Sequence, residues 1–175
     1  MRKWISVLVA ICLLTGCSDT ILQKQTFTIE MGKDVYANPS LYVKDGVNTD
    51  GMSVKSLEAG IRKVDNRFVS GNNEYLLVGT YDFALVSSTG HETAFKIKIK
   101  DTQPPTLGNG ISTVTLSIGQ VVNWDDIFHA TDLSGVSYEL IPNIDTSVAG
   151  NYTCDLKVQD RYGNATTKSI TIIVE

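Results

Sequence analysis

The sequence predicts an all-β protein built from two β-sandwich units in tandem. Three observations lead to this fold class: apolar and polar residues alternate over 150–174, a second copy of that pattern lies over 79–100, and short Gly, Asn and Asp segments separate the alternating runs. A period of two places one set of side chains on a core face and the other toward water. Strands at this spacing, parted by such turns, are typical of a sandwich.

The amino terminus has the features of a targeting segment. Met1-Arg2-Lys3 is basic, and Trp4 to Leu14 is an apolar run interrupted only by Ser6. As a helix that run would span roughly 16 Å, about half of a ~30 Å hydrocarbon core. Residues 1–16 therefore fit a signal peptide better than a permanent membrane span.

The end of this segment, Leu14-Thr15-Gly16-Cys17, resembles the bacterial lipobox. The resemblance implies cleavage before Cys17 and acyl chains, such as palmitate, on that residue, with 17–25 as the lipidated cysteine and a spacer. Two or three acyl chains at ~0.8 kcal/mol per buried CH₂ make a durable anchor. We therefore expect a lipoprotein on the extracytoplasmic face of the cell membrane, or in the outer membrane of a cell that has one. The alternatives are an ordinary secretory peptide and a short anchor helix.

The rest of the chain contains an internal repeat, which predicts two similar units. Thr26–Val35 matches Thr113–Val122 at a constant offset, and Gly79–Leu85 matches Gly150–Leu156. We expect one unit over 26–100 and the other over 101–175. Their inward residues are expected to be Phe95, Ile97 and Ile99 in the first unit and Tyr152, Cys154, Leu156, Val158, Ile170, Ile172 and Val174 in the second.

A stiff hinge is predicted between the units. Pro104 and Pro105 hold an extended backbone, so the units should stand end to end.

The strand expected to face Cys154, over 128–131, contains no cysteine. We therefore predict no disulfide and a small buried thiol at Cys154.

Five short motifs mark the second unit: Asp-x-x-Pro-Pro over 101–105, Ala130-Thr131-Asp132-x-x-Gly135, Ile144-Asp145-Thr146, Gly150-x-Tyr152 and Asp160-x-x-Gly163-Asn164. With them, residues 101–175 resemble the small bacterial immunoglobulin-like domains found in tandem on surface proteins and at the ends of some insecticidal crystal toxins. The resemblance implies an immunoglobulin-like sandwich that serves as a spacer or a binding module. The first unit matches more loosely and is interpreted as a divergent copy.

Three aspartates are candidate metal ligands. Asp132 and Asp160 lie in Asp-x-x-Gly loops, and in an immunoglobulin-like sandwich these loops gather at the end that also holds Asp101 on the hinge. Together they could supply carboxylate oxygens to Ca²⁺, which takes six to eight oxygen ligands at about 2.3–2.6 Å. The alternative is that Asp132 and Asp160 accept backbone N–H bonds within their own turns.

Other functional signals are weak. Trp124, beside Asp125 and Asp126, is a candidate for stacking on a sugar ring, or else a plug at the end of the sandwich. His91 and His129 form no metal or nucleophile pattern, and no catalytic motif is present, so we expect no enzyme.

Composition narrows the function classes. The net charge is −4, and −6 without Arg2 and Lys3, with no basic stripe, which argues against nucleic acid. The leading hypothesis is a non-catalytic binding or adhesive module for a protein or glycan. The alternative is a passive spacer or envelope-assembly subunit without a ligand of its own.

Overall fold

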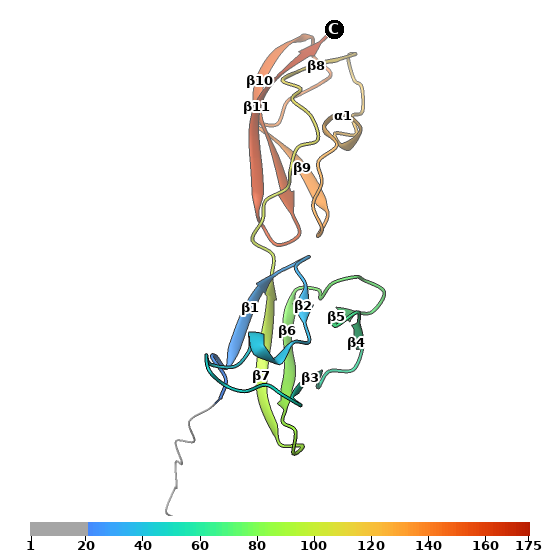
Figure 1. Ribbon diagram of the computed structural model, residues 1–175. Coiled ribbons are helices and arrows are strands. Elements are labelled where there is room, and N and C mark those ends of the chain that lie inside the picture. Colours follow the sequence, from blue (N-terminus) through green and yellow to red (C-terminus); the bar gives the residue numbers. More distant parts are fainter. Residues whose placement is uncertain (1–20) are drawn as a thin grey trace, which may run out of the picture.

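The first unit is a sandwich of a four-stranded and a three-stranded sheet (Figure 1). The computed structural model describes residues 21–175, so the predicted signal peptide and Cys17 lie outside the described residues. The larger sheet has the order β1-β7-β6-β3, with β1 parallel to β7, and the smaller has the order β2-β5-β4. The elements are β1 Thr26–Glu30, β2 Val35–Tyr36, the 3-10 turn η1 Pro39–Leu41, β3 Ser53–Ser56, β4 Ile61–Val64, β5 Arg67–Ser70, β6 Gly79–Val86 and β7 Glu92–Lys100.

The core of this unit follows from the alternation along β7. Phe95, Ile97 and Ile99 are buried, and the lysines between them point to solvent. The Phe95 ring stacks on Phe83 of β6 with the ring centroids 5.8 Å apart. The Phe83 ring also contacts Phe68 of β5, with the centroids 4.9 Å apart, so aromatic rings join the two sheets.

The second unit has one long sheet with the order β8-β11-β10-β9, in which β8 is parallel to β11. Its elements are β8 Thr113–Leu116, the helical turn α1 Asp125–Phe128, β9 Val136–Ile141, β10 Gly150–Asp160 and β11 Ala165–Val174. The hairpin predicted from the alternation is present, with β10 and β11 paired from Gly150↔Val174 to Gln159↔Ala165. Leu156 and Ile172 on its inner face are fully buried.

The layer that covers this hairpin differs from the expectation of a strand over 128–131. The helical turn α1 ends at Phe128, His129 follows in the left-handed conformation with φ 47°, and only Thr131 forms a β-bridge, to Thr106. Asp125 and Asp126 lie in the first turn of α1, where negative charge suits the helix dipole. Phe128 still fills the core, because one helical turn also directs it inward.

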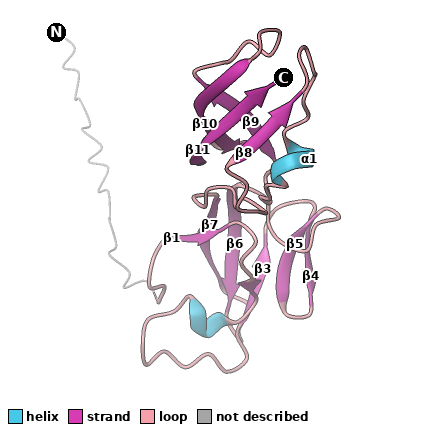
Figure 2. Cartoon of the chain, turned by 90° about the horizontal axis from the view of Figure 1, so that it is seen from above, coloured by secondary structure: helices cyan, strands magenta, loops and turns pink. Residues whose placement is uncertain are grey.

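The two units have separate hydrophobic clusters and stand end to end in both views (Figures 1 and 2). The all-β sandwich class is confirmed, and the boundaries at 26 and 101 stay predictions. Among residues 21–175 there is no helix with the length and apolar character needed to cross a membrane.

Candidate functional site at the junction of the units

The linker that joins the units is tied to both of them. On the first unit, the carboxylate of Glu30 accepts hydrogen bonds from the backbone N–H and the hydroxyl of Thr102, at 2.7 and 2.9 Å. On the second unit, the Asn164 amide donates to the backbone carbonyl of Asp101 at 3.2 Å. These bonds hold Asp101 against the turn that joins β10 to β11.

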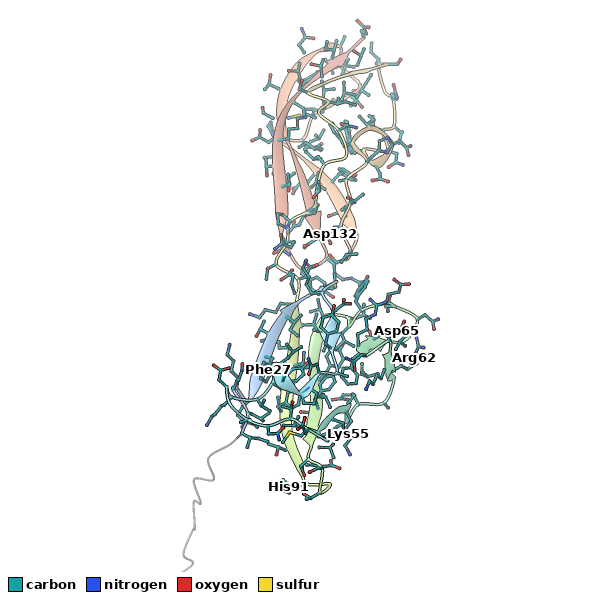
Figure 3. All side chains as sticks on the ribbon, in the orientation of Figure 1. Phe27, Lys55, Arg62, Asp65, His91 and Asp132 are labelled. Atoms are coloured by element: carbon teal, nitrogen blue, oxygen red, sulfur yellow. The ribbon has the colours of Figure 1, made fainter. Side chains whose placement is uncertain are left out.

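Three carboxylates meet at this place. Asp101 lies on the linker, Asp132 in the loop before β9, and Asp160 at the end of β10. Each has an oxygen within 4.8 Å of an oxygen of the other two. Figure 3 labels Asp132 at the end of the second unit that faces the first. The structure thus brings together the three residues that the sequence singled out.

Two of these carboxylates have the predicted role in their own turns. One oxygen of Asp160 accepts from the backbone N–H groups of Tyr162 and Asn164 at 2.8 and 2.9 Å, and the other from the Asn164 side chain at 2.6 Å. Burial raises the pKa of Asp160, but these hydrogen bonds bring it below its usual value. Asp132 accepts from the N–H and hydroxyl of Ser134 at 2.8 and 2.7 Å. The turn role of both residues is confirmed.

Asp101 is the member of the group with an unsatisfied carboxylate oxygen. Its Oδ2 is buried and, among the described residues, accepts no hydrogen bond. Burial raises the pKa of Asp101, and the nearby charges of Asp132 and Asp160 raise it further. Both charged groups named here are carboxylates, so they repel an ionised Asp101. A cation between the three would remove that repulsion.

Two cavities adjoin the group. One, of about 380 Å³, lies between the units, and Asp101, Asp132, Met31 and Leu133 are among its lining residues. The other, of about 520 Å³, lies on the second unit and shares Asp132 with the first. Asp132 therefore lines both cavities.

Trp124 and Cys154 lie elsewhere in the second unit. The half-buried Trp124 lies at the start of α1. The centroid of its ring is 6.3 Å from that of Phe128, so Trp124 packs against the core. Stacking of Trp124 on a sugar stays a prediction. Cys154 is a buried free thiol, as expected, and burial followed by the charge of Asp155 raises its pKa.

Two junction contacts were missed by the sequence reasoning. One is the Glu30–Thr102 pair described above. The other is Leu133, whose methyl group lies so close to Gly32 that a Cβ at that glycine would be 2.4 Å away. Leu133 occupies a variable position of the Asp-x-x-Gly motif, and no pattern in the sequence distinguishes it.

No protein-family model and no curated protein matches the chain. Solved structures similar to it include the human mucin-like protocadherin EC1-2, at 15% identity over 88% of this chain and 97% of that one, with a TM-score of 0.34. Fibronectin(III)-like modules of Clostridium thermocellum CbhA are 18% identical over 85% of this chain and 88% of theirs, with a TM-score of 0.30. The human desmocollin-1 ectodomain is 10% identical over 87% and 36%, with a TM-score of 0.31.

Proposed function

We propose that this protein is a lipid-anchored, non-catalytic module on the extracytoplasmic face of a membrane, and that calcium at the junction stiffens it. In this proposal the first unit stands next to the bilayer and the second unit is held away from it to contact a protein or glycan. The anchor rests on the Leu-Thr-Gly-Cys motif at Cys17. The observation that carries the proposed stiffening is the cluster of three carboxylates formed by Asp101, Asp132 and Asp160.

The group has the chemistry that Ca²⁺ prefers, which is several carboxylate oxygens within a few ångströms. A carboxylate has about four lone-pair sites, so the hydrogen bonds in the turns of Asp132 and Asp160 leave acceptor capacity on both residues. The buried Oδ2 of Asp101 has no hydrogen-bond donor within the described part of the chain. A divalent cation would satisfy it and offset the mutual repulsion of the three charges.

Charge is unevenly divided along the chain, which favours a cation in the second unit. Residues 21–100 contain ten Lys and Arg against nine Asp and Glu, whereas 101–175 contain three against nine. The second unit is therefore strongly acidic. A surface of one sign raises the local concentration of the opposite ion.

Calcium at this place would act on the angle between the units. Asp101 belongs to the linker, whereas Asp132 and Asp160 belong to loops of the second unit. An ion bound by all three would fix the linker to the second unit. Because Thr102 of the linker is bonded to Glu30, the first unit would be held as well.

Calcium binding is tested by thermal unfolding in calcium and in chelator, with two matched variants. Asp132 and Asp145 accept the same pair of bonds, each from the N–H and hydroxyl of the serine two residues on. Only Asp132 belongs to the carboxylate group. Asp132→Asn should abolish the rise in Tm with calcium, and Asp145→Asn should keep it. At free calcium a hundredfold above Kd, the expected stabilisation is about 2.7 kcal/mol. An unchanged Tm between calcium and chelator would remove the metal from the proposal.

The anchor is tested separately by the variant Cys17→Ala. Wild-type protein should sediment with membranes and take up labelled palmitate, and the variant should do neither. If the variant sediments as the wild type does, the anchoring part of the proposal is wrong.

The second candidate function is a passive spacer. Exposed aliphatic side chains occur on both units, such as Leu57 on the first and Val121 on the second, so exposure by itself does not separate a binding module from a spacer.

A further inference from the structure

The second unit contains the one Asn-Gly sequence of this chain, Asn109-Gly110. In such a sequence the backbone nitrogen of the glycine can attack the side-chain amide of the asparagine. The attack is easiest at glycine, because glycine has no Cβ that obstructs the approach of its nitrogen. Asn109 is therefore a candidate for spontaneous chemical modification, and its surroundings decide what the modification would do.

The side chain of Asn109 is folded back over the peptide group that would attack it. Its Oδ1 accepts a hydrogen bond from the backbone N–H of Ile111 at 3.2 Å, which closes a ring containing both Cγ of Asn109 and the nitrogen of Gly110. A donor on Oδ1 also stabilises the negative charge that develops on this oxygen during attack. Gly110 is exposed, and its N–H donates no hydrogen bond within residues 21–175.

The same turn occurs at three other asparagines, which makes the difference at Asn109 clear. In each of them Oδ1 accepts from the N–H two residues on, at 3.1 Å for Asn38, 2.9 Å for Asn48 and 3.3 Å for Asn123. Their next residues are proline, threonine and tryptophan. Proline has no N–H to lose, and the other two have side chains that crowd the attack. Only Asn109 combines this turn with a glycine.

We propose that Asn109 is a deamidation site of the folded protein, and that its conversion loosens the helical turn α1 in the second unit. The nitrogen of Gly110 forms a bond to Cγ, the bond from Cγ to Nδ2 breaks, and Nδ2 leaves as ammonia with the proton that the Gly110 nitrogen gives up. Water then opens the cyclic imide at either carbonyl, which leaves aspartate or isoaspartate at position 109. Neither the anchor nor calcium takes part.

The amide of Asn109 holds the end of α1, so its loss has a structural effect. Nδ2 donates to the carbonyl of Ile127 at 2.6 Å, and the Gly108 N–H donates to the next carbonyl, that of Phe128, at 3.1 Å. The contact is close, because a Cβ at Gly108 would lie 2.4 Å from the His129 carbonyl oxygen. An ionised carboxylate has no hydrogen to donate. Deamidation therefore replaces a hydrogen bond with repulsion between two oxygens.

The loosened turn also forms a wall of the larger cavity. Asp125 of α1 accepts a hydrogen bond from the Tyr138 hydroxyl at 2.6 Å, and both residues line the cavity of about 520 Å³. In the intact protein α1 is thus held by Tyr138 on β9 and by the segment 108–109. Deamidation removes the second attachment and leaves the Tyr138 bond and the buried ring of Phe128. The modification should change both the stability of the second unit and this cavity.

The first test measures the rate at each asparagine. The soluble chain that begins at Ser18 is incubated in mildly alkaline buffer, and its peptides are mapped by mass spectrometry over time. Asn109 should be converted while Asn48 and Asn123, which have the same turn, remain amides. Gly110→Ala should slow the conversion by about tenfold or more, because the added Cβ crowds the attacking nitrogen. This variant should keep the fold, since that Cβ would meet nothing within 4 Å.

Conversion at Asn109 no faster than at Asn48 or Asn123, or an unchanged rate in Gly110→Ala, would overturn the site. Ion-exchange chromatography separates the product, because deamidation adds a negative charge. Isomerisation of the two Asp-Gly sequences, at Asp45 and Asp50, adds none and does not interfere.

The second test measures the effect on α1 with Asn109→Asp. Calorimetry should find the Tm of the second unit lower by about 4–8 °C, the shift expected when one such hydrogen bond is lost in a unit of this size. Asn48→Asp is the matched control and should leave both transitions unchanged, because Nδ2 of Asn48 donates no hydrogen bond within residues 21–175. Wild-type protein deamidated by incubation and isolated by ion exchange provides a second measurement if the variant folds poorly. An unchanged Tm in that species would overturn the loosening of α1.

Discussion

Replacing Leu156 by alanine should destabilise the second unit and leave the first unchanged. Leu156 is fully buried in the middle of β10, where it faces Leu140 of β9 and Lys168 of β11 in the register of the sheet. Such a substitution in a core costs about 2–5 kcal/mol, from lost transfer free energy and the cavity that remains. For a unit of about 75 residues the whole free energy of unfolding is about 4–11 kcal/mol.

The assay is differential scanning calorimetry of the soluble chain. With a loss of about 3 kcal/mol and a shift of about 4–8 °C per kcal/mol, the Tm of the second unit should fall by about 12–24 °C. Phe83→Ala, at a fully buried position of the first unit, should lower the other transition instead. Because the two hydrophobic clusters are separate, each substitution should lower only the transition of its own unit. If Leu156→Ala lowers both transitions by the same amount, the two cores are coupled and the reasoning is refuted.

Three further predictions concern ionisable groups. The Tyr36 hydroxyl and then Arg67 hold the pKa of Asp34 below its usual value, so the stability that Asp34 contributes is present above its ordinary pKa and lost as the pH falls through the lowered one. Tyr36→Phe should raise that pKa in a carboxyl NMR titration, and an unchanged value would contradict the assignment. Burial raises the pKa of Tyr42 to about 12, so ultraviolet titration at pH 11 should find this phenol still protonated. Cys154, whose thiol pKa burial raises, should react with iodoacetamide only at the rate of unfolding, and fast reaction in the folded chain would show that the thiol is accessible.

The hairpin of the second unit could be read from the sequence, because a period of two is a local property of the chain. Alternation from Tyr152 to Val158 settles which side chains face inward before any tertiary contact is known. The same local signal was ambiguous at Phe128. A short apolar run flanked by acids can be buried as a strand or as one helical turn, and the structure has the turn.

The sequence predicted which three aspartates form the candidate site, but it predicted only part of their hydrogen bonding. Asp-x-x-Gly loops at one end of a sandwich indicated that Asp132 and Asp160 would approach Asp101. Which of the three has an unsatisfied oxygen could not be predicted, because the hydrogen bonds of Asp160 depend on how Asn164 is placed by the turn after β10. The unsatisfied oxygen of Asp101 is a result of burial at the junction.

The sequence by itself determined the strand pattern, the repeat and the acidic balance of the second unit, since each is a property of residues close together in the chain or of composition. Only the tertiary structure decided that Leu133 lies on Gly32 and that one oxygen of Asp101 is left unsatisfied. A contact between loops that lie about a hundred residues apart leaves no local pattern in the chain, which is why only the folded structure reveals it.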